Sequence, residues 1–355
     1  MVSTSSAPKA RRRPWRRRFA WAAATLVAIC LFVVLAFQVS PRPGSLVIRW
    51  AFDKGGASAN EALAPLVPAD VTGIEDVSYG DAGKDTTLDA WFPASVADTD
   101  RTLPTVVWVH GGGWVSGDKS QVANYLKILA SNGFTVIGIN YSIAPGAKYP
   151  TPVKQTNEAL AYLKTNAARL HADTSTIVLA GDSAGAQIAA QVAAITTNPD
   201  YAAEVGVAPS LQPSELAGTV LNCGPYVPAM VEDAGGIGGW FVKTVAWAYI
   251  GTKDFDAPIM DQADLVANST ASFPPTWISG GNNDPLTEQG RAFATHLSGL
   301  GVDVSPLFFP DDHTPALGHE YQFDLTLEDS KRALNETVAF VERVTVAEAT
   351  TPTAD

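Results

Sequence analysis

The pentapeptide Gly181-Asp182-Ser183-Ala184-Gly185 places a serine between two glycines that each lie two positions away. A serine hydroxyl becomes a nucleophile for acyl transfer when a base takes its proton and N–H groups stabilise the oxyanion. Apolar residues 177–180 predict a strand before Ser183, and residues 184–195 predict a helix after it. In such a strand–turn–helix the serine has a strained backbone at a helix N-terminus. We interpret Ser183 as a candidate nucleophile; the alternative is a glycine-rich turn with Ser183 as N-cap.

A second glycine-rich motif, His110-Gly111-Gly112-Gly113-Trp114, follows an apolar run that predicts a strand. Acyl transfer puts negative charge on the former carbonyl oxygen, and glycine lets backbone N–H groups approach it without a side-chain clash. We expect the N–H groups of Gly112, Gly113 and Ala184 to form the oxyanion hole. His110 is expected to orient this loop rather than to carry protons. A glycine triplet alone would suit a flexible turn equally well, but the serine motif farther along favours the oxyanion role.

The elements around both motifs alternate between short apolar runs rich in β-branched residues and stretches of helical character. Strands that are apolar throughout suit a parallel sheet covered on both faces. The alternation predicts a doubly wound, mostly parallel α/β domain. Ahead of it, a turn-rich segment at 45–100 is expected to hold one hairpin between 75 and 92. Strands are expected at 105–109, 135–140, 176–180, 218–222, 276–279 and 304–308, and helices near 118–132, 152–169, 184–196, 285–300 and 329–345.

These motifs resemble those of the HGGG-carrying branch of the α/β-hydrolases, the hormone-sensitive-lipase-like and related carboxylesterases. The resemblance covers roughly residues 75–345. It implies the α/β-hydrolase fold, a Ser–Asp–His triad in that chain order, ester hydrolysis through an acyl-enzyme on Ser183, and no metal or organic cofactor. The residues that carry it are HGGGWVSGDK (110–119), NYSIAPGAKYPTPV (140–153), LAGDSAGAQIAA (179–190) and NNDPL (282–286).

The acid of such a triad is expected at Asp284. It follows the predicted strand 276–279, and sites in α/β sheets form at the carboxyl ends of the strands. The resemblance supports this position, because family members carry the triad aspartate in a similar D-P-L setting. Asp284 could instead cap the helix that begins near Pro285, and the two roles can coexist.

Two histidines compete for the role of base, His313 and His319, and both lie in the loop after the last predicted strand. Family members have one histidine here, usually followed two residues later by an aromatic residue. His319 has Tyr321 at that position, whereas His313 has no aromatic residue there. The spacing from Asp284 favours His313, and the spacing from the late aromatic Phe340 favours His319. We predict His319 as the base, with His313 as the alternative.

Residues 19–39 form an uncharged, apolar run, and about 20 such residues suffice to cross a bilayer. Seven bases precede this run within residues 1–18, which predicts a cytoplasmic tail and an extracytoplasmic body. We expect an uncleaved transmembrane anchor at 19–39. The alternative is a signal peptide whose cleavage releases a secreted product, although the run is longer than usual and its best cleavage site, Val34-Leu35-Ala36, is weak.

Charge and cysteine content narrow the classes of partner. Residues 19–355 carry 17 bases and 36 acids, which disfavours nucleic acid as a partner. Cys30 and Cys223 cannot supply a disulfide framework or a cysteine-based metal site. The expected organisation is a basic tail (1–18), an anchor (19–39), a hydrolase domain (45–346) with cap elements at 45–75 and 224–262, and a disordered tail (347–355).

The sequence therefore predicts a membrane-anchored, extracytoplasmic carboxylesterase that acts on a small-molecule or lipid-like ester. Two other interpretations stay open. The first is another activity on the same fold, such as that of a formamidase, a peptidase or a lipase. The second is a non-catalytic binding module, which the combined presence of serine, acid and histidine disfavours because binding alone does not need all three.

Overall fold

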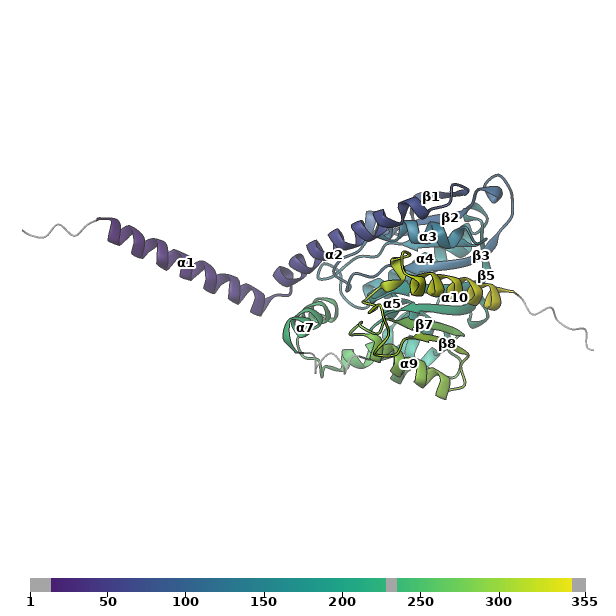
Figure 1. The fold of residues 1–355 in the computed structure, drawn as a ribbon. Coiled ribbons are helices and arrows are strands. Elements are labelled where there is room, and N and C mark those ends of the chain that lie inside the picture. The colour runs from purple at the N-terminus through teal and green to yellow at the C-terminus, as the bar shows by residue number, and fades with distance from the viewer. Residues whose placement is uncertain (1–13, 228–234, 347–355) are drawn as a thin grey trace, which may run out of the picture.

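The computed structural model describes residues 14–227 and 235–346 (Figure 1). The tail expected at 347–355 and most of the basic tail expected at 1–18 lie outside the described residues. The long helix α1 (Pro14–Val39) extends away from a body of mixed strands and helices (Figure 1).

An eight-stranded sheet forms the centre of the body, in the order β1-β2-β4-β3-β5-β6-β7-β8. The pairs β1–β2 and β2–β4 are antiparallel, and all the other pairs are parallel. The predicted hairpin and the predicted mostly parallel sheet are both confirmed. The strands are β1 (Val71–Ser78), β2 (Thr87–Pro93), β3 (Leu103–Val109), β4 (Thr135–Ile139), β5 (Ala172–Asp182), β6 (Leu216–Asn222), β7 (Thr276–Gly280) and β8 (Val304–Phe308).

Helices cover both faces of the sheet. Successive side chains of a strand point to opposite faces, so an apolar strand feeds two cores. In β3, Val107 packs in the same cluster as helices α4 and α5, whereas Val106 and Trp108 pack with α3 and α10. The helices of the body after β2 are α3 (Ala123–Ala130), α4 (Thr151–Asn166), α5 (Ala184–Thr197), α6 (Pro199–Val205), α7 (Gly236–Ile250), α8 (Leu265–Asn268), α9 (Thr287–Gly299) and α10 (Glu328–Thr345).

The segment expected to be turn-rich begins instead with a helix, α2 (Arg42–Leu63). Its two adjacent glycines, Gly55 and Gly56, weaken helix propensity. Contacts with the body override this preference: Arg49 donates hydrogen bonds to the carbonyls of Val115 (2.6 Å) and Ala144 (2.9 Å). Most helical stability in proteins comes from such tertiary contacts rather than from propensity.

One helix among the described residues is long and apolar enough to cross a membrane, the part of α1 from Arg17 to Val39. None of the residues in its most apolar stretch is buried against the body. Anchors and signal sequences share these properties. The chain breaks between the two helices at Ser40 and Pro41, because α1 ends at Val39 and α2 begins at Arg42.

A buried ion pair ties the antiparallel hairpin to the glycine-rich loop after β3. The Lys119 ammonium lies 2.6 Å from Asp89 Oδ1 and 2.7 Å from Asp76 Oδ1. The side chains of Lys119 and Asp89 are both nearly inaccessible to solvent, at 7% and 5% exposure. A charged side chain in such a position needs an oppositely charged partner, because it has lost the water that would otherwise stabilise its charge.

Replacing Lys119 with methionine should therefore destabilise the body. The change leaves Asp89 as an unpaired buried carboxylate, which typically costs about 3–5 kcal/mol. Chemical denaturation of the purified chain measures the effect as a lower free energy of unfolding. Lys331→Met is the matched control, because the Lys331 side chain is 48% exposed and pairs with Glu328 on the surface. Equal stability of both variants would contradict this account.

Candidate active site

Ser183 lies at the sharp turn from β5 into α5, as the sequence predicts. Its φ is 51°, in the left-handed region that non-glycine residues rarely adopt. The two motif glycines permit the turn: a Cβ on Gly181 would collide with the backbone of Gly185, and a Cβ on Gly185 would collide with the carbonyl oxygen of Val109. The Ser183 N–H donates to the Asn222 carbonyl of β6 (2.8 Å), which fixes the turn against the neighbouring strand.

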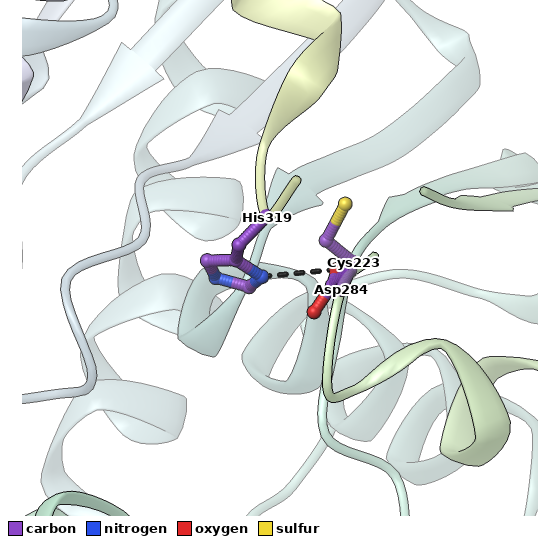
Figure 2. Close-up of side chains that lie close together, drawn as sticks. All are labelled: Cys223, Asp284 and His319. Carbon is purple, nitrogen blue, oxygen red and sulfur yellow. Dashed lines mark hydrogen bonds and ion pairs between the residues drawn. The ribbon is translucent and has the colours of Figure 1, made fainter. Parts of the chain in front are cut away.

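The structure brings Ser183, His319 and Asp284 together in one hydrogen-bonded chain. Ser183 Oγ–H donates to His319 Nε2 (2.9 Å), and His319 Nδ1–H donates to Asp284 Oδ2 (3.0 Å). Figure 2 shows the second of these bonds, with the imidazole edge facing the carboxylate. The Asp284 side chain is fully buried, whereas that of His319 keeps 31% exposure. A histidine held in this way can accept a proton from the serine hydroxyl.

The pKa of His319 is raised to about 9. Burial alone lowers it, but the hydrogen bond to Asp284 and the negative charges of Glu320 and Asp284 together outweigh burial. The imidazolium that forms when His319 takes a proton is therefore stabilised by its surroundings.

Asp284 performs two structural tasks at once. While Oδ2 accepts from His319, Oδ1 accepts from the N–H of Leu286 (2.9 Å), at the start of α9. The loop that carries His319 is pinned to the same turn by Asn282, whose Oδ1 accepts from the Leu317 N–H (2.8 Å). The two loops that must present acid and base are thus joined directly.

The structure places His313 away from Ser183. Its Nε2 lies 2.8 Å from Asp329 Oδ2 at the start of α10, and its ring packs against Phe309. His313 therefore ties its loop to the last helix, while His319 faces the serine.

The glycine-rich loop after β3 approaches the same point. Gly112 and Gly113 have φ values of 109° and 59°, which suit glycine alone without strain. In the part of the chain described here, the N–H of neither glycine donates a backbone hydrogen bond in a loop or turn. Ala184 is the first residue of α5, where an N–H has no partner within the helix. The three N–H groups expected from the sequence to be oxyanion donors are those of Gly112, Gly113 and Ala184.

His110 is buried inside this loop. Its Nδ1 lies 2.8 Å from the Gly111 carbonyl, and its ring stacks on Tyr141 at 4.4 Å between centroids. Burial lowers the pKa of His110, which favours the neutral form. These contacts suit a residue that orients the loop.

Sequence reasoning missed two carboxyl groups at the site, Asp182 and Glu320. Asp182 Oδ1 accepts from Trp108 Nε1 (2.7 Å), and Oδ2 accepts from the Gly111 N–H (2.8 Å), so Asp182 holds the start of the glycine loop. Glu320 Oε1 lies 3.8 Å from His319 Nε2. Burial, and then the charge of Glu320, raise the pKa of Asp182 well above its usual range. The available signals were the acids themselves, because one directly precedes Ser183 and the other directly follows His319.

A cavity of about 550 Å³ opens beside these groups. This volume lies within the usual range for small-molecule sites. One wall is the second half of α2, where small residues leave space. The other wall comes from the glycine loop and the loop that carries His319. The α2 wall includes Ala51, Gly55, Ala59 and Ala62, and the opposite wall includes Gly111, Gly112, His319 and Phe323.

The α2 helix also supports the glycine loop directly. Asp53 Oδ1 accepts from Ser116 Oγ (2.6 Å), and Arg49 holds the Val115 carbonyl. The segment expected as a cap element at 45–75 thus contains a helix that lines the cavity and braces the loop. The other expected cap segment, 224–262, contains α7, which packs against α2; its residues 228–234 lie outside the described residues.

Cys223 lies beside Asp284 and His319, and ligand atoms of the three residues are within 4.8 Å of one another (Figure 2). A metal ion would need a thiolate and free acceptor atoms. Burial, and then the charge of Asp284, raise the pKa of the Cys223 thiol, which favours its protonated form. His319 and Asp284 are already bonded to each other. The cluster therefore suits proton transfer better than metal binding.

Residues 106–313 match a family model described as the alpha/beta hydrolase fold. The chain belongs to this α/β-hydrolase family. An esterase of Gibberella moniliformis is 32% identical over 226 residues, which cover 59% of this chain and 66% of that protein. The carboxylesterase NlhH of Mycobacterium tuberculosis is 28% identical over 286 residues, covering 76% and 82%. The chain spans less than two thirds of the length of several curated relatives, including 57% of a putative hydrolase of Acanthamoeba polyphaga mimivirus.

The α/β-hydrolase fold is also seen in solved structures. Esterase B of Lactobacillus rhamnosis superposes with a TM-score of 0.73 at 23% identity, covering 85% of this chain and 95% of that one. The fold predicted from the sequence is confirmed, as is the resemblance to this family.

The pH dependence of this α/β-hydrolase should report the charges around His319. His319 accepts a proton only when neutral, so kcat/KM for an ester should rise with pH through the His319 pKa, which is about 9. Glu320→Gln removes a negative charge near Nε2 and lowers that pKa, while burial still disfavours ionised Asp182. The rising limb should move to lower pH. The surface variant Glu328→Gln is the control, and an unmoved limb in Glu320→Gln would refute this electrostatic role.

Proposed function

We propose that this protein is a carboxylesterase-type serine hydrolase that cleaves carboxylic esters through an acyl-enzyme on Ser183. The observation that carries the proposal is the continuous chain from Ser183 Oγ through His319 to Asp284, with bonds of 2.9 and 3.0 Å. The open glycine loop and the adjacent cavity support it. Relatives named as esterase and carboxylesterase support the ester as the bond cleaved.

In this mechanism His319 takes the proton of Ser183 as Oγ attacks the ester carbonyl carbon. The tetrahedral oxyanion binds the N–H groups of Gly112, Gly113 and Ala184. Collapse of the intermediate expels the alcohol, which receives the proton from His319. A water molecule, deprotonated by the same histidine, then attacks the acyl-enzyme and releases the carboxylic acid and free Ser183.

Other activities on the same fold differ in the bond they cleave. A panel of p-nitrophenyl acyl esters of graded length, amides and formyl amides separates an esterase from a lipase, a peptidase or a formamidase. A fluorophosphonate probe separates all of these from a binding module, because it labels only an activated serine.

Substitutions in the triad test the proposal. Ser183→Ala and His319→Ala should each lower kcat for p-nitrophenyl butyrate by several orders of magnitude, at least about 10³-fold, because nucleophile and base act as a unit. His313→Ala is the matched control and should cost far less, since His313 contacts Asp329 rather than Ser183. Collapse of activity in His313→Ala with near-normal turnover in His319→Ala would reverse the assignment of the base.

We further propose that α1 is an uncleaved anchor and that the body lies on the extracytoplasmic side. The length and hydropathy of Arg17–Val39 support an anchor, and the bases before it support this orientation. The alternative is a signal sequence whose removal gives a secreted enzyme.

The two fates of α1 predict different products in cells. An anchored chain should stay with membranes after high-salt and carbonate washing, and protease added outside should digest its body. A cytoplasmic marker protein controls for membrane integrity. A soluble product whose N-terminus lies near residues 37–45 would contradict the anchor and support the secreted form.

A further inference from the structure

Exposed apolar side chains are concentrated in one region outside α1. Among the described residues after α1, seven large apolar side chains are exposed, and five of them lie on two adjoining segments. We call these five the leaflet face: Leu46 (61% exposed), Val47 (53%) and Trp50 (69%) on α2, and Ile237 (87%) and Trp240 (43%) on α7. A contiguous exposed apolar patch marks a site that meets a protein or a membrane.

The two segments are packed together. A Cβ on Gly44 of α2 would meet side-chain atoms of Thr244 and Trp240 on α7, and the rings of Phe52 and Phe241 lie 5.3 Å apart. The side of α2 with Arg49 is taken up by the body. The leaflet face is thus the remaining side of α2, continued by the first turns of α7.

Charge around the leaflet face has the opposite sign to that of the body. Residues 40–56 and 236–256 together carry five bases and three acids, whereas residues 19–355 carry 17 bases and 36 acids. Lys54 lies over the Trp50 ring, 5.9 Å from its centroid. Tryptophans flanked by lysines are typical of the membrane–water interface, where the ring sits at headgroup level and the ammonium reaches lipid phosphates.

The leaflet face is also continuous with α1. Only Ser40 and Pro41 separate the two helices, and Leu46 lies about one turn into α2. Lys253, just after α7, donates to the Gln38 carbonyl at the end of α1 and covers the Trp247 ring at 4.1 Å. Figure 1 shows α7 beside the junction of α1 and α2. A bilayer that holds α1 therefore ends next to this face.

We propose that the leaflet face rests on the outer surface of the bilayer that holds α1, so that the enzyme takes esters whose acyl chains lie in that leaflet. The proposal rests on the proposed anchor and esterase activity. The cavity wall begins at Ala51 and Phe52, directly after Trp50 on the same helix. An acyl chain that leaves the leaflet along α2 meets the small-residue wall of the cavity, and the opposite wall of that cavity includes Gly112 and His319.

Depth-dependent quenching tests the contact in the full chain. Leu46→Cys and Ile237→Cys, each made with Cys30→Ser and labelled with an environment-sensitive nitrobenzoxadiazole dye, are placed in vesicles of phosphatidylcholine and phosphatidylglycerol. Nitroxide-labelled lipids should quench both dyes strongly. Val346→Cys is the matched control, since Val346 is 71% exposed at the far end of α10 and should stay unquenched. Equal, weak quenching at all three positions overturns the proposal.

Activity provides the second readout. In the same vesicles, the double variant Leu46→Asp/Ile237→Asp should hydrolyse an embedded long-chain diacylglycerol about tenfold more slowly, because two apolar contacts with the bilayer are lost. Hydrolysis of soluble p-nitrophenyl acetate should change less than about twofold, and Val346→Asp should leave both rates unchanged. An unchanged diacylglycerol rate in the double variant overturns the proposal.

Failure of the proposed esterase activity or of the proposed anchor gives results that differ from failure of the leaflet contact. If the unsubstituted chain cleaves no soluble ester, the esterase assignment fails, while dye quenching still decides the contact. If the chain does not float with vesicles, the anchor fails, and the leaflet contact fails with it. The dye fluorescence could instead rise with protein concentration and remain unquenched by nitroxide-labelled lipid. That result would assign the face to a second copy of the chain and overturn the proposal.

Discussion

The turn from β5 into α5 depends on one steric constraint, the close crossing of α5 over the end of β3. Gly185 lies so near the Val109 carbonyl that any side chain would displace the helix, and Gly181 is equally confined by Gly185. This crossing forces Ser183 into a left-handed backbone and turns its hydroxyl out of the sheet. The strain is sustained because the Ser183 N–H donates to the Asn222 carbonyl of β6 and because the surrounding residues are buried.

The other candidate groups at the site lie on loops that are bonded to that turn or to one another. Asp182 bonds Gly111, the first glycine of the glycine-rich loop after β3, so Ser183 and the expected oxyanion donors share one junction. Asn282 bonds the loop of His319 to the loop of Asp284. Parallel strands end at the same edge, so these loops begin as neighbours, but the cross-loop bonds set the distances that chemistry needs.

The parts of this arrangement that were predictable are those specified locally. Apolar β-branched runs gave the strands, and the glycine pattern around Ser183 gave the turn. The aromatic residue two positions after His319 is the main sequence signal that distinguishes it from His313, and the structure has Tyr321 buried there beside Phe309. The α2 helix was not foreseen, because its glycines weaken the local signal and its stability comes from bonds to segments distant in sequence. Arg49 and Asp53 bond the loop after β3, and Asn60 bonds the start of α3. The proximity of Asp182 and Glu320 could not be predicted from the sequence either, because the two acids are far apart along the chain.

The α2 helix connects the anchor to the chemistry through a division of its surface. One side bonds the loop that follows the oxyanion glycines, through Arg49 and Asp53. A second side packs α7 in its first turns and lines the cavity in its later ones. The third side is left to solvent and carries Leu46 and Trp50. Because a helix transmits displacement along its length, the orientation of α2 at the end of α1 also sets the position of the oxyanion loop. A helix with only a tethering role would not need to hold that loop by partly buried polar contacts, so these contacts indicate that α2 is part of the framework of the candidate active site.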